Sequence, residues 1–115
     1  MIPVLPPAEV EVDASRRYIA VNDSACQLLG YSREELLNMR IDDISFPSGA
    51  HVKTMYAQYE EDGNMIGIFA LRRKSGEAIW VRFQAQTIDG RSRATWTHYE
   101  SWDPDKAARP ELDFP

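Results

Sequence analysis

The pattern of apolar and polar residues between positions 18 and 38 predicts a short strand that leads directly into two small helices. Residues 18–21, Tyr-Ile-Ala-Val, are apolar and of types that favour β-strands. Asn22 can accept hydrogen bonds from the free N–H groups of a first helical turn, so a helix is expected to begin there. Apolar residues then recur at helical spacing up to Gly30, a residue type that ends helices in the left-handed conformation.

A second helix is predicted immediately afterwards by a pair of reciprocal capping residues. Ser32 and Glu35 have the spacing of a capping box, in which each side chain binds the backbone N–H of the other residue. Tyr31 and Leu36 are placed to pack against each other across this cap. Residues 41–46 are expected to form one further helical turn, with its isoleucines and phenylalanine facing inward.

The second half of the chain changes from a helical period to a strand period. Apolar residues at helical spacing predict a longer helix over residues 50–61. From residue 64 the apolar residues alternate, which predicts strands over residues 65–71, 78–87 and 93–102. Asp89-Gly90, between the last two strands, is a strong signal for a hairpin turn.

The order of these elements predicts an α+β fold in one domain. Alternating valines near the start predict a first strand that forms a hairpin with residues 18–21. The predicted order of elements is therefore two strands, several short helices and three strands. Residues 1–8 hold three prolines and are expected to form an extended arm. Residues 9–103 would be the folded domain, and residues 104–115 a C-terminal tail.

Composition narrows the range of functions. A length of 115 residues allows one hydrophobic core, without room for a second catalytic unit. The formal net charge of −5 argues against a general affinity for nucleic acid or acidic membranes. The apolar runs are too short to span a membrane, and the N-terminus lacks the features of a signal peptide. The single cysteine, Cys26, excludes an internal disulfide and fits a cytoplasmic location.

Two stretches resemble the PAS domain, a cytoplasmic sensor module of bacterial and eukaryotic signalling proteins. Residues 22–37, Asn-Asp-Ser-Ala-Cys-Gln-Leu-Leu-Gly-Tyr-Ser-Arg-Glu-Glu-Leu-Leu, are similar to its N-terminal helical core. Residues 71–81, Leu-Arg-Arg-Lys-Ser-Gly-Glu-Ala-Ile-Trp-Val, are similar to its strand–turn–strand with a basic stretch, a glycine turn and a tryptophan. One departure is Ser15-Arg16, where PAS domains usually have a turn glycine. The resemblance implies a five-stranded antiparallel sheet in strand order 2-1-5-4-3, with the helices packed on one face.

Alternation along the strands assigns the two faces of this sheet. In residues 78–87 the uniformly apolar face contains Val81 and Phe83, so it should point toward the helices. In the preceding strand, the resemblance implies that Phe69 and Leu71 face inward. In the last strand, the inward side chains are expected to be Thr95, Thr97 and Tyr99.

The same alternation leaves large apolar side chains on the outer face of the sheet. Those expected there are Ile66, Ile68, Trp80, Trp96 and Trp102. A tryptophan buries roughly 150–250 Å², so several of them would not be left in water. The face is therefore expected to pack on a second copy or on an effector protein, and PAS domains commonly dimerise through it. Alternatively, residues 3–7 and the tail cover it.

The resemblance also places a ligand pocket between the inner sheet face and the helices. Its walls would come from Leu28, Ile41, Ile44, Met55, Tyr59, Phe69, Leu71, Val81, Phe83, Thr97 and Tyr99. Only Tyr59, Thr97 and Tyr99 in this set carry polar groups, which suits a small apolar or aromatic ligand with one or two hydrogen-bonding ends. The alternative is that these side chains simply fill a core.

Two cofactors of the family can be compared with the sequence. The light-sensing branch carries a reactive cysteine in an Asn-Cys-Arg run, where this chain has Arg-Ile-Asp at residues 40–42, so a covalent flavin adduct is excluded. Cys26 lies on an earlier helix and is expected to be a core or half-buried residue. His51 stands where haem-binding PAS proteins carry their axial histidine, so it is either a haem ligand or a surface or capping residue. The histidines and the cysteine give no zinc pattern.

Catalysis is not expected from the residues present. No Ser–His–Asp set and no phosphate-binding glycine loop occur, and the single basic cluster is not a nucleic-acid footprint. A small α+β cavity enzyme is the alternative, and it would need a carboxylate or a histidine inside the cavity. The sequence therefore predicts a PAS sensor or interaction domain in signal transduction. It would bind a small ligand in its core, dimerise through the outer sheet face, or do both.

Overall fold

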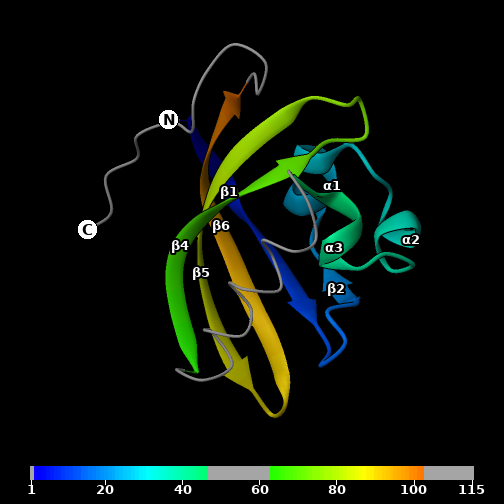
Figure 1. The fold of residues 1–115 in the computed structure, drawn as a ribbon, viewed down its shortest axis with the longest axis vertical. Coiled ribbons are helices and arrows are strands. Elements are labelled where there is room, and N and C mark those ends of the chain that lie inside the picture. Colours follow the sequence, from blue (N-terminus) through cyan, green and yellow to red (C-terminus); the bar gives the residue numbers. More distant parts are fainter. Residues whose placement is uncertain (1, 47–62, 103–115) are drawn as a thin grey trace.

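The computed structural model of the chain describes residues 2–46 and 63–102, which form an antiparallel sheet with short helices on one face (Figure 1). The strands are β1 (Ile2–Val12), β2 (Tyr18–Val21), β3 (Ser45–Phe46), β4 (Asn64–Arg72), β5 (Ala78–Ile88) and β6 (Arg91–Trp102). The helices are α1 (Asp23–Leu29), α2 (Arg33–Leu36) and α3 (Ile41–Ile44). The strand order is β2-β1-β6-β5-β4-β3. The predicted α+β class is confirmed, and the helix expected over residues 50–61 lies outside the described residues.

The five predicted strands lie in the predicted order, and a sixth strand extends one edge of the sheet. This strand, β3, consists of two residues that pair with the end of β4. The helical turn expected over residues 41–46 is shorter than predicted, because Ser45 leaves the helical conformation. The hydroxyl of Ser45 donates a hydrogen bond of 2.7 Å to the carbonyl oxygen of Ile41, which satisfies an acceptor at the helix end.

Strand β1 begins much earlier than predicted. Ile2 and Pro3 pair with β6, and after a register shift the pairing resumes at Ala8. Two consecutive prolines lie within the interruption, and they have no N–H group to donate to a neighbouring strand. The described part of the segment expected as an arm, residues 2–8, is therefore part of the sheet.

The predicted helix caps are confirmed. Asn22 Oδ1 accepts a hydrogen bond of 3.0 Å from the backbone N–H of Ala25 at the start of α1. The helix ends at Gly30, whose φ of 81° lies in the left-handed region that glycine adopts at low cost. Both hydrogen bonds of the capping box between Ser32 and Glu35 are present in α2. These local signals fix where the two helices begin and end.

Two tight turns join neighbouring strands. Asp89 and Gly90 have φ values of 49° and 77°, as expected for a two-residue hairpin turn between β5 and β6. In the turn between β1 and β2, for which the resemblance implied a glycine, Arg16 has a φ of 68°. The Asp13 carboxylate accepts a hydrogen bond of 2.9 Å from the Ser15 backbone N–H and stabilises this turn.

The hydrophobic core lies between the inner face of the sheet and the helices. Buried side chains from all three helices and from strands β1, β2, β4, β5 and β6 contact one another there. The predicted inner face of β5 is confirmed, since Ile79, Val81 and Phe83 belong to this core. None of the helices within residues 2–46 and 63–102 has the length and apolar composition needed to cross a membrane.

A bulge in β6 reverses the predicted face of one large side chain. Arg82 of β5 pairs with His98 of β6. The next residue of β5, Phe83, pairs with Trp96, so Thr97 is an extra residue between two pairs. Trp96 consequently lies on the inner face, where it is 1% exposed and part of the core. The prediction that Trp96 lies on the outer face is wrong, because strict alternation cannot account for an inserted residue.

Candidate functional site

The structure brings most of the described residues of the predicted pocket together in the core. Those that are at most 8% exposed and share one cluster are Leu28, Ile44, Leu71, Val81 and Phe83. Ile41 and Tyr99 are partly buried and pack against this cluster. Met55, Tyr59 and the side chain of Phe69 lie outside what the structure describes. The inner face therefore has the predicted apolar character.

The polar groups of the interior differ from the predicted ones. Thr97 is the extra residue of the bulge, and its Oγ1 lies 3.1 Å from Nδ1 of His98. Tyr99 keeps its predicted inward position. The prediction that Thr95 faces inward is wrong, because the same bulge turns Thr95 to the outer face, where it pairs with Gln84. The position of Thr97 could not be predicted from alternation, because the bulge displaces it from the regular ladder.

Tyr18 is a buried polar residue that the sequence analysis did not single out. Its side chain is 1% exposed, and among the described residues its hydroxyl has no hydrogen-bond partner. Burial raises the pKa of Tyr18 well above its usual value, and the nearby carboxylates of Asp43 and Asp42 raise it further. A buried hydroxyl without a partner costs about 1–3 kcal/mol, so this group is suited to bind a water molecule or a ligand. In the sequence, Tyr18 was recognisable only as a strand-forming residue.

Lys74, in the turn between β4 and β5, fastens the first two helices to the sheet. Its Nζ lies 3.0 and 2.8 Å from the two carboxylate oxygens of Glu35. Its backbone N–H donates a hydrogen bond of 2.9 Å to the carbonyl oxygen of Leu29, at the end of α1. The Lys74 ammonium group, together with the Ser32 backbone N–H, holds the pKa of Glu35 below its usual value.

Two further sets of contacts hold helices against the strands. Asn22 Oδ1 accepts a hydrogen bond of 3.0 Å from the Glu9 backbone N–H, and Nδ2 donates one of 3.0 Å to the carbonyl oxygen of Pro7. The guanidinium group of Arg16 donates two hydrogen bonds, of 2.9 and 3.0 Å, to the carboxylate of Asp42 in α3. The helices are therefore tied to one face and one end of the sheet, which leaves the opposite face uncovered by them (Figure 1).

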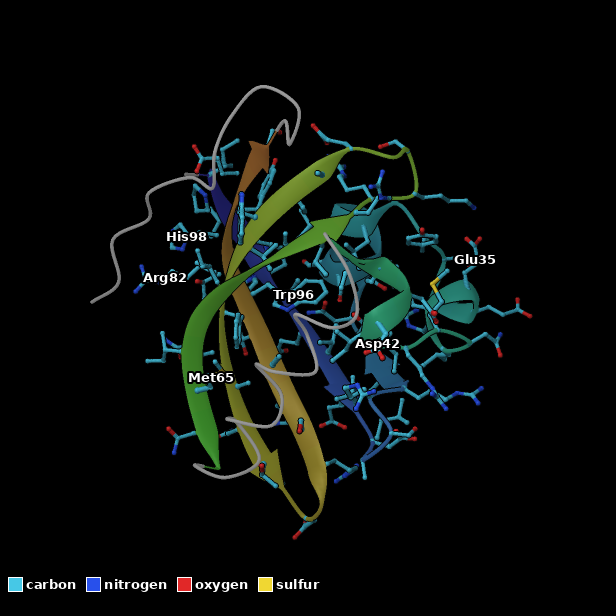
Figure 2. All side chains as sticks on the ribbon, in the orientation of Figure 1. Glu35, Asp42, Met65, Arg82, Trp96 and His98 are labelled. Atoms are coloured by element: carbon cyan, nitrogen blue, oxygen red, sulfur yellow. The ribbon has the colours of Figure 1, made fainter. Side chains whose placement is uncertain are left out.

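The outer face carries both charged and apolar side chains (Figure 2). Arg82 and His98 extend from the sheet on the side away from the helices, whereas Trp96 lies on the helical side. Ile66 is 54% exposed. Ile68 and Trp80 form a separate cluster with Ala70 and are already buried within the single chain, and the side chain of Trp102 is not described. Of the apolar residues predicted for this face, Ile66 is thus the one that the structure shows exposed.

Two surface hollows lie on this outer face, one on each side of β6. The first has a volume of about 310 Å³ and is lined by Glu9, Glu11, Ala20 and Arg93, among others. The second has a volume of about 270 Å³ and is lined by Asn64, Ile66, Gln84, Gln86 and Thr95, among others. Neither hollow contains a residue of the predicted ligand pocket. The outer face is therefore uneven and largely polar around Ile66.

The sequence matches the model of one known protein family over most of its length. The family model described as "PAS domain" matches residues 8–98. The chain belongs to the PAS family. PAS domains are signal-sensing modules, so this chain is a signal-sensing module. No curated protein sequence matches the chain.

Solved structures show the same fold at low sequence identity. A PAS domain from a two-component sensor histidine kinase is 20% identical, with 84% of this chain and 85% of that chain covered and a TM-score of 0.67. The PAS domain of a protein from Colwellia psychrerythraea is 19% identical, with 78% and 83% covered and a TM-score of 0.69. The PAS domain of a LuxR-family transcriptional regulator from Burkholderia thailandensis, crystallised in complex with ethanol, is 16% identical, with 84% and 88% covered and a TM-score of 0.68.

Of the histidines and the cysteine that could bind a cofactor, the structure describes Cys26 and His98. Cys26 is half-buried in α1, and burial raises the pKa of its thiol, which disfavours the reactive thiolate. His51 lies outside the described residues. His98 lies on the outer face, where it cannot reach a group bound in the core. Within residues 2–46 and 63–102, no three histidine, cysteine or acidic side chains gather in a way that could hold a metal ion.

Proposed function

We propose that this PAS domain acts in signal transduction by binding a partner protein through the outer face of its sheet. The observation that carries the proposal is the exposure of Ile66, at 54%, beside a hollow on the face that the helices leave open. Ile68, Trp80 and Trp102 would border the contact. The partner is a second copy or an effector protein, in the cytoplasm, and no catalytic role is assigned to the domain itself.

The proposal is tested by Ile66→Asp. A carboxylate placed in a buried apolar contact should weaken association by about tenfold or more, because it loses its hydration there. Ile2→Asp is a matched control, since Ile2 is also 54% exposed but pairs with Tyr99, whose side chain faces the core. Sedimentation equilibrium measures self-association, and circular dichroism checks that both variants are folded. Self-association that is equally strong in Ile66→Asp contradicts the proposal.

A second candidate function is the binding of a small apolar or aromatic ligand between the sheet and the helices. The observation that favours it is the buried Tyr18 hydroxyl, which would donate a hydrogen bond to an acceptor on the ligand. The ethanol complex of the structurally similar Burkholderia domain supports a small compound. Leu28, Ile41, Ile44, Leu71, Val81, Phe83 and Tyr99 would surround it, with Met55, Tyr59 and Phe69 as further expected contacts.

Native mass spectrometry of freshly purified protein tests this second candidate. A ligand mass should be retained by the parent and by Tyr31→Phe but lost in Tyr18→Phe. A bare chain in every sample, with Tyr18→Phe as stable as the parent or more stable, contradicts it, because removing an unsatisfied hydroxyl costs nothing. A haem form would depend on His51. It predicts a Soret band in the same sample that His51→Ala abolishes, and no such band contradicts it.

A further inference from the structure

The buried hydroxyl of Tyr18 belongs to the part of the core where β2 meets α3. The backbone N–H of Tyr18 donates a hydrogen bond of 3.0 Å to the carbonyl oxygen of Met39, and the N–H of Ile41 donates one of 2.9 Å to that of Arg16. These two bonds hold the start of β2 beside the start of α3. The Tyr18 side chain shares the hydrophobic core with Ile44 of α3, and each is 1% exposed. The hydroxyl is therefore a hydrogen-bond donor within an apolar part of the core.

The charged groups that act on this hydroxyl are two carboxylates of α3. Burial and, after it, the carboxylates of Asp43 and Asp42 raise the pKa of Tyr18. Asp42 accepts two hydrogen bonds, of 2.9 and 3.0 Å, from the guanidinium group of Arg16, so these two charges largely cancel. Asp43 accepts a hydrogen bond of 2.9 Å from the backbone N–H of Arg40, and among the described residues it has no ion-pair partner. The charge left uncompensated beside the hydroxyl is therefore negative.

These features limit the kind of molecule that the hydroxyl can bind. A tyrosine hydroxyl that stays protonated donates a hydrogen bond, so its partner must be an acceptor. A carboxylate would be costly there, because it would lose its hydration and be repelled by Asp43. The guanidinium group of Arg16 already binds Asp42 and does not offset that cost. The oxygen of an alcohol, a ketone or an amide accepts the same hydrogen bond without carrying a charge into the core.

We infer that the core of this domain selects neutral ligands that carry a hydrogen-bond acceptor, with the Tyr18 hydroxyl as the donor and Asp43 acting against anionic ligands. The inference rests on the second candidate function, ligand binding in the core, and names the class of ligand. The acceptor lies at the end of the ligand next to α3, and the apolar part lies among the side chains of the core. Such a ligand supplies the partner that the hydroxyl lacks, whereas a hydrocarbon leaves it unsatisfied.

Three probes of similar size test the inference. Benzyl alcohol is neutral and has an acceptor, benzoate is anionic, and toluene has no acceptor. Each is titrated to about 3 mM into the isotope-labelled full chain near neutral pH, and changes in its amide spectrum give the dissociation constants. The parent should bind benzyl alcohol about tenfold or more tightly than the other two. Tyr18→Phe should weaken benzyl alcohol by about tenfold and leave toluene within about twofold, because only the alcohol uses the hydroxyl.

A second variant tests the selection against anions. Asp43→Asn removes the charge but keeps an oxygen for the N–H of Arg40. Benzoate should then bind about threefold or more tightly, while benzyl alcohol stays within about twofold. The gain is modest because Asp43 is exposed, and water screens its charge. Glu34→Gln is the matched control, since Glu34 is an exposed carboxylate of α2 that does not act on Tyr18, and it should change neither constant.

The outcomes separate this inference from ligand binding in the core as such. Preference for benzyl alcohol that depends on Tyr18, with a gain for benzoate in Asp43→Asn, supports the inference. If toluene or benzoate binds the parent as tightly as benzyl alcohol, or if either variant leaves the constants unchanged, the core binds ligands without this selection and the inference is wrong.

Native mass spectrometry covers the case in which no probe binds. A retained compound that is neutral, has an acceptor and is lost in Tyr18→Phe supports the inference, because it already occupies the site. A retained anion or hydrocarbon overturns it and leaves the second candidate function standing. A bare chain that binds no probe overturns both.

Discussion

Replacing Asn22 with alanine should cost about 3 kcal/mol of the free energy of unfolding. The Asn22 side chain caps α1 through the Ala25 N–H, and a cap of this kind contributes about 1 kcal/mol. It also accepts a hydrogen bond from the Glu9 N–H and donates one to the Pro7 carbonyl oxygen, and each such bond contributes about 1 kcal/mol. One side chain thus connects β1, the end of β2 and α1.

Two further variants separate these contributions. Asn22→Asp keeps both acceptor roles of Oδ1 but places an oxygen against the Pro7 carbonyl, so it should cost only about 1–2 kcal/mol. Asn38→Ala is the control, because Asn38 is exposed. Its Nδ2 donates a hydrogen bond of 3.0 Å to the carbonyl oxygen of Glu34, and its Oδ1 accepts a long one of 3.5 Å from Arg17. This control should cost about 0.5 kcal/mol or less.

Urea-induced unfolding, followed by tryptophan fluorescence, measures the free energy of unfolding of the parent and of all three variants. The slope of the unfolding free energy with urea should not change, since the folded structure buries the same surface. If Asn22→Ala costs no more than Asn38→Ala, the bridging role given to Asn22 is refuted. If Asn22→Asp costs as much as Asn22→Ala, the acceptor roles of Oδ1 contribute nothing and the reasoning about the cap fails.

Three other predictions follow from the described contacts. Trp96→Ala should cost about 3–5 kcal/mol in the same urea assay, as expected for an aromatic residue in the core, and a loss below about 1 kcal/mol would contradict its inner position. Asp42→Ala should cost about 1 kcal/mol, because it removes a half-buried bidentate partner of Arg16, and a midpoint equal to that of the parent would argue against the pair. The pKa of Glu35 is lowered by Lys74, so its ionised form stabilises the folded state above a pH of about 4.5, and this contribution is lost as the pH falls below that value. The difference in urea midpoint between the parent and Glu35→Gln should therefore be largest near neutral pH and vanish in acid, and a difference that persists in acid would contradict the assignment.

Much of this fold could be predicted because its decisive signals are local. Asn22, Gly30 and the pair Ser32 and Glu35 each fix a helix end through hydrogen bonds or a backbone angle within a few residues. Asp89 and Gly90 fix a hairpin in the same way. The early start of β1 depends instead on pairing with a strand about ninety residues later, which no local pattern of prolines and valines reveals.

The candidate site was less predictable for a related reason. Alternation correctly placed Val81 and Phe83 inward, because β5 is regular over those residues. Tyr18 was missed because the absence of a hydrogen-bond partner depends on how distant segments surround a side chain. The pattern of apolar residues reports burial and gives no information about such partners.

The bulge at Thr97 decides which residues can test an outer-face contact. Without it, Trp96 would share the outer face with His98, and a charged residue at position 96 would be a natural way to break a dimer. With the bulge, Trp96 pairs with Phe83 and its side chain is part of the core. A charged residue at position 96 would therefore unfold the domain, and the variant would give no information about association. Residues whose side chains point outward and are not needed by the core give the informative variants, and Glu9, Ile66 and Arg82 are three of them. A loss of association in those variants, with the unfolding midpoint unchanged, can only come from the outer face.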